Sequence, residues 1–120
     1  MGNKKPLWEK VRNAEQICGT HMALNCPQTT EILGQIGFVW VDTEHTAASF
    51  QDLYYHVKGA QHAGTPVIVR VPMHDRNFVK KVLEMGVDGI IFPMVNTPEE
   101  AKQDISYVMY PPHGVRGFGP

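Results

Sequence analysis

The spacing of short apolar runs is the feature that most constrains how this chain can fold. Two runs, Phe-Val-Trp-Val at residues 38–41 and Val-Ile-Val at residues 67–69, are unbroken and rich in β-branched side chains. Such runs are typical of parallel strands that are covered on both faces. Similar runs before and after them start at nearly regular intervals, as in repeated strand–helix units. We therefore expect strands at residues 16–24, 38–42, 66–71 and 89–95.

The segments between these runs have the apolar spacing of helices. Phe50, Leu53, Val57 and Ala60 recur at steps of three and four, which predicts an amphipathic helix over residues 49–63. Further helices are predicted at residues 30–35 and 75–85, and one is predicted to begin at Thr97-Pro98. Ser49, Asp75 and Thr97 are suitable N-caps for the three longer helices.

The resulting order is an α/β fold of four strand–helix units that share a parallel sheet. Right-handed units of this kind build either a doubly wound sheet or a (β/α)8 barrel. A barrel needs eight units and at least ~200 residues, whereas this sequence has 120. The pattern alone therefore leaves two possibilities open, a small four-stranded α/β protein and the first half of a barrel.

Charge and composition exclude several classes of protein. Lys and Arg total 11 and Asp and Glu total 12, so the formal net charge is −1, which argues against a nucleic-acid-binding domain. The longest apolar stretch is far shorter than the ~20 residues of a membrane-spanning helix, and no apolar segment follows Met1 as in a secretory signal. The spacing of Cys18 and Cys26 predicts neither a disulfide nor a zinc site. We expect a soluble, cytoplasmic protein that binds neither membranes nor nucleic acid.

Polar side chains follow the predicted strands where each strand ends, and reactive residues gather there in parallel βα folds. Asp42, Glu44 and His45 follow the second strand, and Arg70 ends the third. His45 is a candidate general base because imidazole titrates near neutral pH. Arg70 is a candidate electrophile because a fixed guanidinium can hold a carboxylate or a developing enolate. Asp42 and Glu44 either support these two groups or bond neighbouring backbone, and a solvated loop histidine remains the alternative for His45.

The positions of the other histidines and of the lysines limit the kinds of catalytic mechanism that the sequence supports. His56 and His62 lie on the helix at 49–63 and are expected at the surface, whereas His21, His74 and His113 receive no role. No lysine lies at a predicted strand end. If the site is of the aldolase type, this makes Schiff-base chemistry from this segment less favourable than metal-assisted chemistry.

Four segments in this order resemble the HpcH/HpaI aldolases, the 4-hydroxy-2-oxoheptanedioate aldolase group with its 2-keto-3-deoxy sugar acid relatives. They read FVWVDTEH at 38–45, PVIVRVP at 66–72, IIFPMVN at 90–96 and YPPHGVRGFG at 110–119. The resemblance extends from about residue 17 to residue 120. It favours the barrel over the four-stranded protein and implies that residues 1–120 are the N-terminal half of a single (β/α)8 barrel whose second half is absent.

The resemblance also implies an activity and a set of site residues. It implies a class II, divalent-metal-dependent aldolase that cleaves a 4-hydroxy-2-oxo acid to pyruvate, or a related 2-oxo acid, and an aldehyde. His45 matches the family's general base and Arg70 the arginine beside the pyruvate oxygen, while Glu84 stands where the family often has an Asp that supports the histidine. The longer Glu84 side chain departs from that pattern.

The metal, which would be Mg, Mn or Co, is held in this family by one Glu and one Asp of the second half, so the resemblance implies no metal ligand among residues 1–120. It also implies a homohexamer. Two alternatives remain open: a citrate-lyase-like or phosphoenolpyruvate-type lyase, and an inactive half-barrel. The isolated chain is expected to be inactive in any case.

Overall fold

The computed structural model describes residues 5–119. Four parallel strands form one sheet in the order β1 (Gly19–Met22), β2 (Phe38–Asp42), β3 (Val67–Arg70) and β4 (Gly89–Ile91). All three neighbouring pairs are parallel, and the strand order follows the chain order. The predicted α/β class with a sheet of parallel βα units is confirmed.

The helices that follow the strands begin and end close to where the sequence predicts them. They are α2 (Pro27–Leu33) with the 3-10 turn η1 (Gly34–Ile36), α3 (Phe50–His62), α4 (Arg76–Glu84) and α5 (Pro98–Val108). Ser49 and Thr97 each form a capping box, and the Asp75 carboxylate accepts a hydrogen bond from the Phe78 backbone N–H. These side chains satisfy backbone donors that the first turn leaves free. The three predicted caps are confirmed.

The first and fourth strands are shorter than the predicted ranges. β1 pairs only with β2, and its register runs from Gly19 opposite Phe38 to Met22 opposite Val41. β4 ends at Ile91, and shortly afterwards Met94 has a positive φ of 52°, which an extended strand cannot contain. The short helix also begins earlier than predicted, because Pro27 fits the first helical turn.

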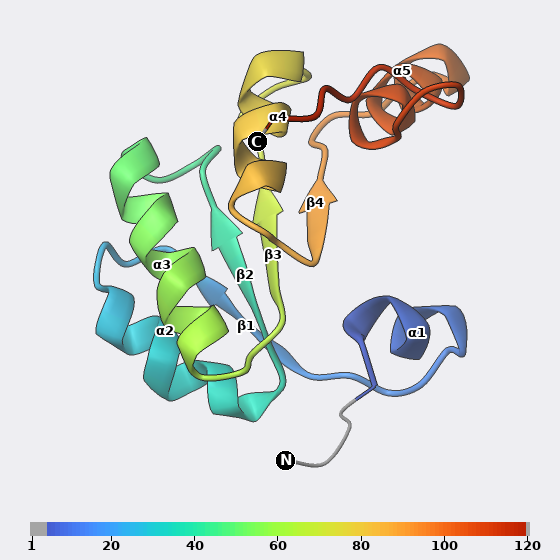
Figure 1. Cartoon of the computed structure of the whole chain (residues 1–120). Helices are drawn as coiled ribbons and strands as arrows, with labels where there is room; N and C mark the ends of the chain where they lie inside the picture. Colours follow the sequence, from blue (N-terminus) through green and yellow to red (C-terminus); the bar gives the residue numbers. More distant parts are fainter. Residues whose placement is uncertain (1–4, 120) are drawn as a thin grey trace.

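One helix was not predicted. The sequence before residue 16 reads as a charged lead, but Leu7–Arg12 forms the short helix α1, with Leu7 buried. Figure 1 shows α1 apart from the other helices, beside the amino-terminal ends of the strands. A single buried leucine gives too little apolar periodicity to reveal such a helix from sequence.

The sheet is covered on one face, which corrects the expectation of cover on both. In β2 and β3 the side chains of Val39, Val41, Val67 and Val69 are fully buried, and they form the core with residues of α3 and α4. The alternate residues Trp40 and Ile68 on the opposite face are only half-buried. One-sided helical cover is the arrangement within a (β/α)8 barrel, where the other face points to the barrel interior.

His56 of α3 is buried, although the sequence predicted a surface position. His62 is exposed as expected, but His56 is 1% exposed, and its Nδ1 lies 2.6 Å from Thr30 Oγ1. This contact joins α3 to α2. Burial lowers the pKa of His56, so the folded state favours the neutral ring. The expectation of a surface position was wrong because Thr30, far away in sequence, supplies the polar partner.

Within residues 5–119, no helix combines the length and the apolar character needed to cross a bilayer.

Candidate active site at the carboxyl ends of the strands

The sheet register brings the predicted site residues of β2 and β3 side by side. Asp42 and Arg70 are Cα partners at the carboxyl ends of these two strands. Because side chains alternate between faces along a strand, both lie on the face that the helices leave uncovered. His21 of β1 is the Cα partner of Trp40, and it joins the same face.

A bidentate ion pair holds Arg70 in place. Its Nε donates to Asp42 Oδ1 at 2.9 Å, and its Nη2 donates to Asp42 Oδ2 at 2.6 Å. Asp42 is 2% exposed, whereas the Arg70 side chain remains 21% exposed. Two parallel bonds fix the plane of the guanidinium as well as its position. The remaining Arg70 donors are therefore presented at the mouth of the sheet in a fixed orientation.

The electrostatics of this pair favour its ionised form. The Arg70 hydrogen bonds hold the pKa of Asp42 well below its usual range, against the opposing effect of burial, and the backbone N–H groups of Glu44 and His45 lower it further. The hydrogen bond to Asp42 likewise raises the pKa of Arg70. Asp42 therefore remains an anion through the neutral range and serves as an anchor rather than as a proton carrier.

Asp42 also shapes the loop that carries His45. Its Oδ1 accepts from the backbone N–H of Glu44 at 2.9 Å and of His45 at 3.4 Å. The Thr46 hydroxyl donates to the Asp42 carbonyl at 2.6 Å, and the Thr43 hydroxyl donates to the Arg70 carbonyl at 2.6 Å. The bonds of Asp42 and Thr46 are local ones of the kind expected of such residues after a strand, whereas the Thr43 bond crosses to the end of β3. They tie the histidine loop to both strand ends.

Glu44 and His45 complete the group at the strand ends. Glu44 Oε2 lies 3.1 Å from Arg70 Nε and 3.6 Å from His45 Nε2. The His45 side chain is 70% exposed, whereas that of Glu44 is 17% exposed. Glu44 thus adds a second carboxylate to Arg70, and the His45 ring is accessible from the mouth of the sheet. The structure brings together Asp42, Glu44, His45 and Arg70, as the strand-end pattern predicted.

Glu84 lies elsewhere in this chain. It is the last residue of α4 and is exposed. Because α4 follows β3 and runs back along the sheet, its final turn lies towards the amino-terminal ends of the strands (Figure 1), whereas His45 follows the carboxyl end of β2. Among the described residues no hydrogen bond or ion pair joins Glu84 to His45. The resemblance matched Glu84 to a supporting carboxylate, but Glu84 ends α4, as the predicted helix over 75–85 also implies.

Two side chains that the sequence did not assign also lie at this site. The His21 ring centroid is 4.7 Å from that of Trp40, and the Arg70 guanidinium carbon is 5.0 Å from the Trp40 ring. The available signal was the alternation along β1 and β2, which puts His21, Trp40 and Asp42 on one face. The register of β1 with β2, which the sequence does not give, was needed to apply it.

The described residues do not form a complete metal site. Among residues 5–119 no three His, Cys, Asp or Glu side chains gather as a group that could hold a metal ion. Asp42 and Glu44 are the carboxylates at the strand ends, and both are paired with Arg70. The residues present therefore do not fit a divalent cation by themselves.

A second histidine–carboxylate pair lies in the loop after β3. His74 Nδ1 is 2.8 Å and 2.9 Å from the two carboxylate oxygens of Asp104 in α5, and its ring stacks on Phe92 with centroids 6.2 Å apart. Asp104 is 3% exposed. The hydrogen bond to Asp104 raises the pKa of His74, with smaller contributions from Glu100 and the Pro93 backbone. The pair links α5 to the loop that follows β3.

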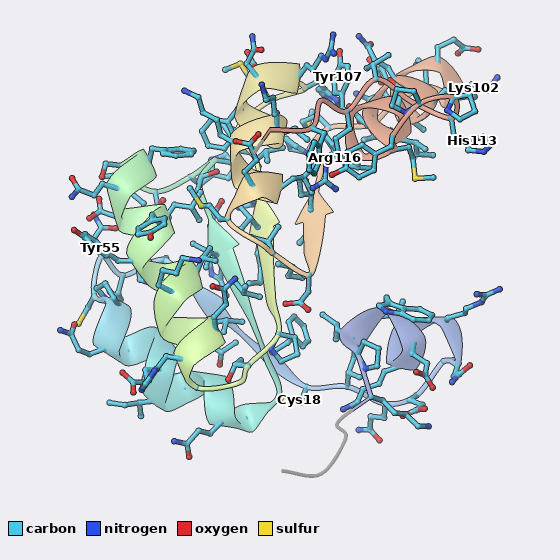
Figure 2. The ribbon with its side chains drawn as sticks, viewed as in Figure 1. Cys18, Tyr55, Lys102, Tyr107, His113 and Arg116 are labelled. Carbon is cyan, nitrogen blue, oxygen red and sulfur yellow. The ribbon has the colours of Figure 1, made fainter. Side chains whose placement is uncertain are left out.

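This pair should make stability depend on pH. Because the folded-state pKa of His74 is raised above the ordinary histidine value of 6.5, the stabilisation that the pair gives is fully present below that pH and is lost as pH rises through the folded pKa. Asp104→Asn should lower the free energy of unfolding at pH 6 by about 1–3 kcal/mol, and by less at pH 9. Denaturant unfolding at both pH values measures this, with Lys102→Ala as the control because Lys102 points outward from α5 (Figure 2). An equal loss at both pH values would contradict a charged pair.

Known proteins share this arrangement over nearly the whole chain. The profile of the HpcH/HpaI aldolase/citrate lyase family matches residues 18–118. The 2-dehydro-3,6-dideoxy-6-sulfogluconate aldolase of Pseudomonas putida is 38% identical over 102 residues, which are 83% of this chain and 40% of that protein.

Two solved structures have the same backbone fold. The HpcH/HpaI aldolase of Desulfitobacterium hafniense has a TM-score of 0.86 and 32% identity, with 95% of this chain and 45% of that chain covered. The citrate synthase SbnG has a TM-score of 0.87 and 30% identity, with 94% and 47% covered. The chain spans less than half the length of each of these relatives. The matching profile, together with strand ends that carry Asp42, Glu44, His45 and Arg70 on one sheet face, shows that the chain belongs to the HpcH/HpaI aldolase/citrate lyase family.

Proposed function

We propose that residues 1–120 form the N-terminal half of a (β/α)8 aldolase barrel and supply part of its active site. The complete enzyme cleaves a 4-hydroxy-2-oxo acid to pyruvate, or a related 2-oxo acid, and an aldehyde. The observation that carries this proposal is the Arg70 guanidinium, which Asp42 holds by two hydrogen bonds at the mouth of the sheet beside the accessible His45 ring.

The reaction needs one group that accepts a proton and one that stabilises negative charge. His45 takes the proton of the 4-hydroxyl, directly or through water, as the bond between C3 and C4 breaks and the aldehyde leaves. The bonding electrons move onto the C2 carbonyl oxygen and give an enolate, whose charge lies against the fixed Arg70 donors. Protonation of C3 then yields the 2-oxo acid. Glu44 lies beside both groups and helps to orient the His45 ring.

The proposal places the divalent metal outside this chain. Mg, Mn or Co remains the cofactor proposed for the complete enzyme, where it would polarise the oxo acid as a Lewis acid. Asp42 and Glu44 are already paired with Arg70, and the described residues gather no three ligand side chains. We propose that its ligands belong to the second half of the barrel.

An exposed apolar groove beside β4 supports the half-barrel proposal. A groove of about 640 Å³ lies between α4, β4 and α5, and it is lined mainly by apolar side chains, including Leu83, Ile90 and Ile105. In a barrel the next strand–helix unit would pair with β4 and cover this groove. Figure 2 shows Arg116 from the tail of the chain between α4 and α5, over the ring of Tyr110.

The proposed partners are small 2-oxo acids and aldehydes, and copies of the same chain. The homo-oligomer, a homohexamer, is proposed from the resemblance; Trp8, Ile32 and Phe118, which are 59%, 68% and 86% exposed, are apolar side chains available for contact with another copy. The net charge is close to zero, so we propose neither a nucleic-acid nor a membrane partner. Cys18 and Cys26 are free thiols, which suits the proposed cytoplasmic location.

One alternative has a specific observation in its favour. SbnG, named as a citrate synthase, resembles this chain as closely as the aldolase does. A citrate-lyase-like or phosphoenolpyruvate-type lyase would use the same arginine to stabilise an enolate, but on a different acid. Turnover of citrate in preference to every 4-hydroxy-2-oxo acid offered would favour this alternative.

The test compares residues 1–120 alone with a completed barrel, in which this chain is joined to the second half that its relatives possess. Each is given Mg, Mn or Co and a panel of 4-hydroxy-2-oxo acids, and pyruvate release is followed by coupling to lactate dehydrogenase. We expect release only from the completed barrel, because the chain alone leaves the edges of β1 and β4 unpaired. Metal-dependent release by residues 1–120 alone would contradict the proposal that this chain supplies only part of the active site. No release by the completed barrel would contradict the proposed aldolase activity.

A further inference from the structure

His21 lies at the mouth beside residues that the proposed reaction uses. We propose that His21 is a positioning residue of this aldolase: it packs on Trp40, faces the carboxylate of Asp42, and so fixes the carboxylate that holds Arg70. The inference rests on the proposed function and adds a residue to the site. His21 acts through Asp42 and does not itself touch the substrate.

The contacts of His21 are all to site residues. Its ring is tilted by 42° to the Trp40 ring with centroids 4.7 Å apart, and its Nε2 lies 3.5 Å from Asp42 Oδ2. Arg70 lies over the same Trp40 ring at 5.0 Å. Trp40 is therefore a platform shared by the histidine and the arginine, and the Asp42 carboxylate lies within reach of both.

The two oxygens of Asp42 are supported unequally. Oδ1 accepts from Arg70 Nε and from the backbone N–H groups of Glu44 and His45. Oδ2 accepts from Arg70 Nη2 at 2.6 Å, and His21 Nε2 faces the same oxygen at 3.5 Å. Without His21, the carboxylate would keep its bonds at Oδ1 but could rotate about that oxygen. The Nη2 edge of the Arg70 fork would move with it.

Trp40 has no polar anchor that could replace this packing. Its Nε1 is buried and has no hydrogen-bond partner among the described residues. The ring is thus held by packing alone, with His21 on β1 and Arg70 on β3 as its polar neighbours. Loss of the His21 ring would loosen the platform as well as the carboxylate. Both effects reach the substrate through the orientation of Arg70.

This role predicts a specific kinetic effect. Arg70 faces charge that develops only as the enolate forms, so misorientation should lower kcat more than it raises KM. The loss should be smaller than for Arg70 itself, because three donors still hold Oδ1. We expect His21→Phe, which keeps a stacked ring but removes the Nε2 contact with Asp42, to lower kcat about tenfold.

The experiment uses the completed barrel with His21→Phe, His21→Gln and the matched control His62→Gln, since His62 is exposed on α3. Circular dichroism establishes a temperature at which all variants are folded. Two readouts are then taken: kcat and KM for pyruvate release, and exchange of the pyruvate methyl protons for deuterium by NMR, which reports enolate formation without any aldehyde.

His21→Phe should fall about tenfold in both readouts, and His21→Gln, which keeps an N–H group but loses the ring that packs on Trp40, should fall by a smaller factor. His62→Gln should match wild type. Wild-type kcat and exchange in His21→Phe would overturn the proposal, because the Nε2 contact with Asp42 would then contribute nothing to the orientation of Arg70. If the wild-type barrel releases no pyruvate, the proposed function fails before His21 is tested.

Discussion

Replacing Arg70 with lysine in the completed barrel should cost about 10²–10³ in turnover, almost as much as replacing it with alanine. Lysine keeps the positive charge, so a site that needs only charge would tolerate it. The structure indicates that the arginine geometry also matters. Arg70 donates from Nε and Nη2 to the two oxygens of Asp42, and its remaining donors face the mouth of the sheet. A single ammonium cannot bond both carboxylate oxygens and an enolate oxygen with fixed directions.

The loss should appear mainly in kcat, since the enolate charge exists only during the reaction. Removal of one preorganised donor to a developing oxyanion costs roughly 3–4 kcal/mol in acyl-transfer enzymes, and we expect a similar cost for the enolate here. Steady-state pyruvate release measures the effect, and Arg12→Lys is the matched control because Arg12 is exposed on the short helix α1. Near-wild-type turnover in Arg70→Lys would show that Arg70 is only structural and that its pair with Asp42 merely ties β3 to β2.

The fold was predictable where local signals and tertiary structure agree. The β-branched runs of β2 and β3 and the caps at Ser49, Asp75 and Thr97 are local features, and each was located within about two residues. The bounds of the short edge strand β1 were not predicted, because they depend on its register with β2. The helix α1 was not predicted either, because it depends on the burial of Leu7. Sequence alone also could not show which face of the sheet the helices cover.

The candidate site was predictable in part for a similar reason. Strand ends in parallel βα folds converge, so Asp42, Glu44, His45 and Arg70 followed from their places after β2 and β3. The bidentate pair itself depends on the alignment of Asp42 with Arg70 across strands, which periodicity does not give. His21 was missed because its place opposite Trp40 depends on the register of β1 with β2, and the buried His56 was missed because its partner Thr30 lies on another helix.

His45 is the residue whose removal should have the largest effect. It is 70% exposed at the carboxyl end of β2, and its loop is tied to both strand ends by Asp42, Thr43 and Thr46. A base held there moves the proton of the 4-hydroxyl. His45→Ala in the completed barrel should lower kcat by about 10²–10⁴, with a much smaller change in KM, because Arg70 still holds the oxo-acid end.

The pH–rate profile separates a base from a loop histidine that only packs or caps. We would measure pyruvate release by wild type, His45→Gln and His45→Ala from about pH 5.5 to 8.5, the window in which an imidazole titrates, with His113→Ala as control because its ring points outward near α5 (Figure 2). For a base, wild-type turnover falls on the acidic side as the imidazole protonates, and His45→Gln loses this dependence together with most of its rate. An acidic limb that is unchanged in His45→Gln, with a rate within a few-fold of wild type, would remove His45 from the mechanism and leave Arg70 with Glu44 as the reactive groups of this half.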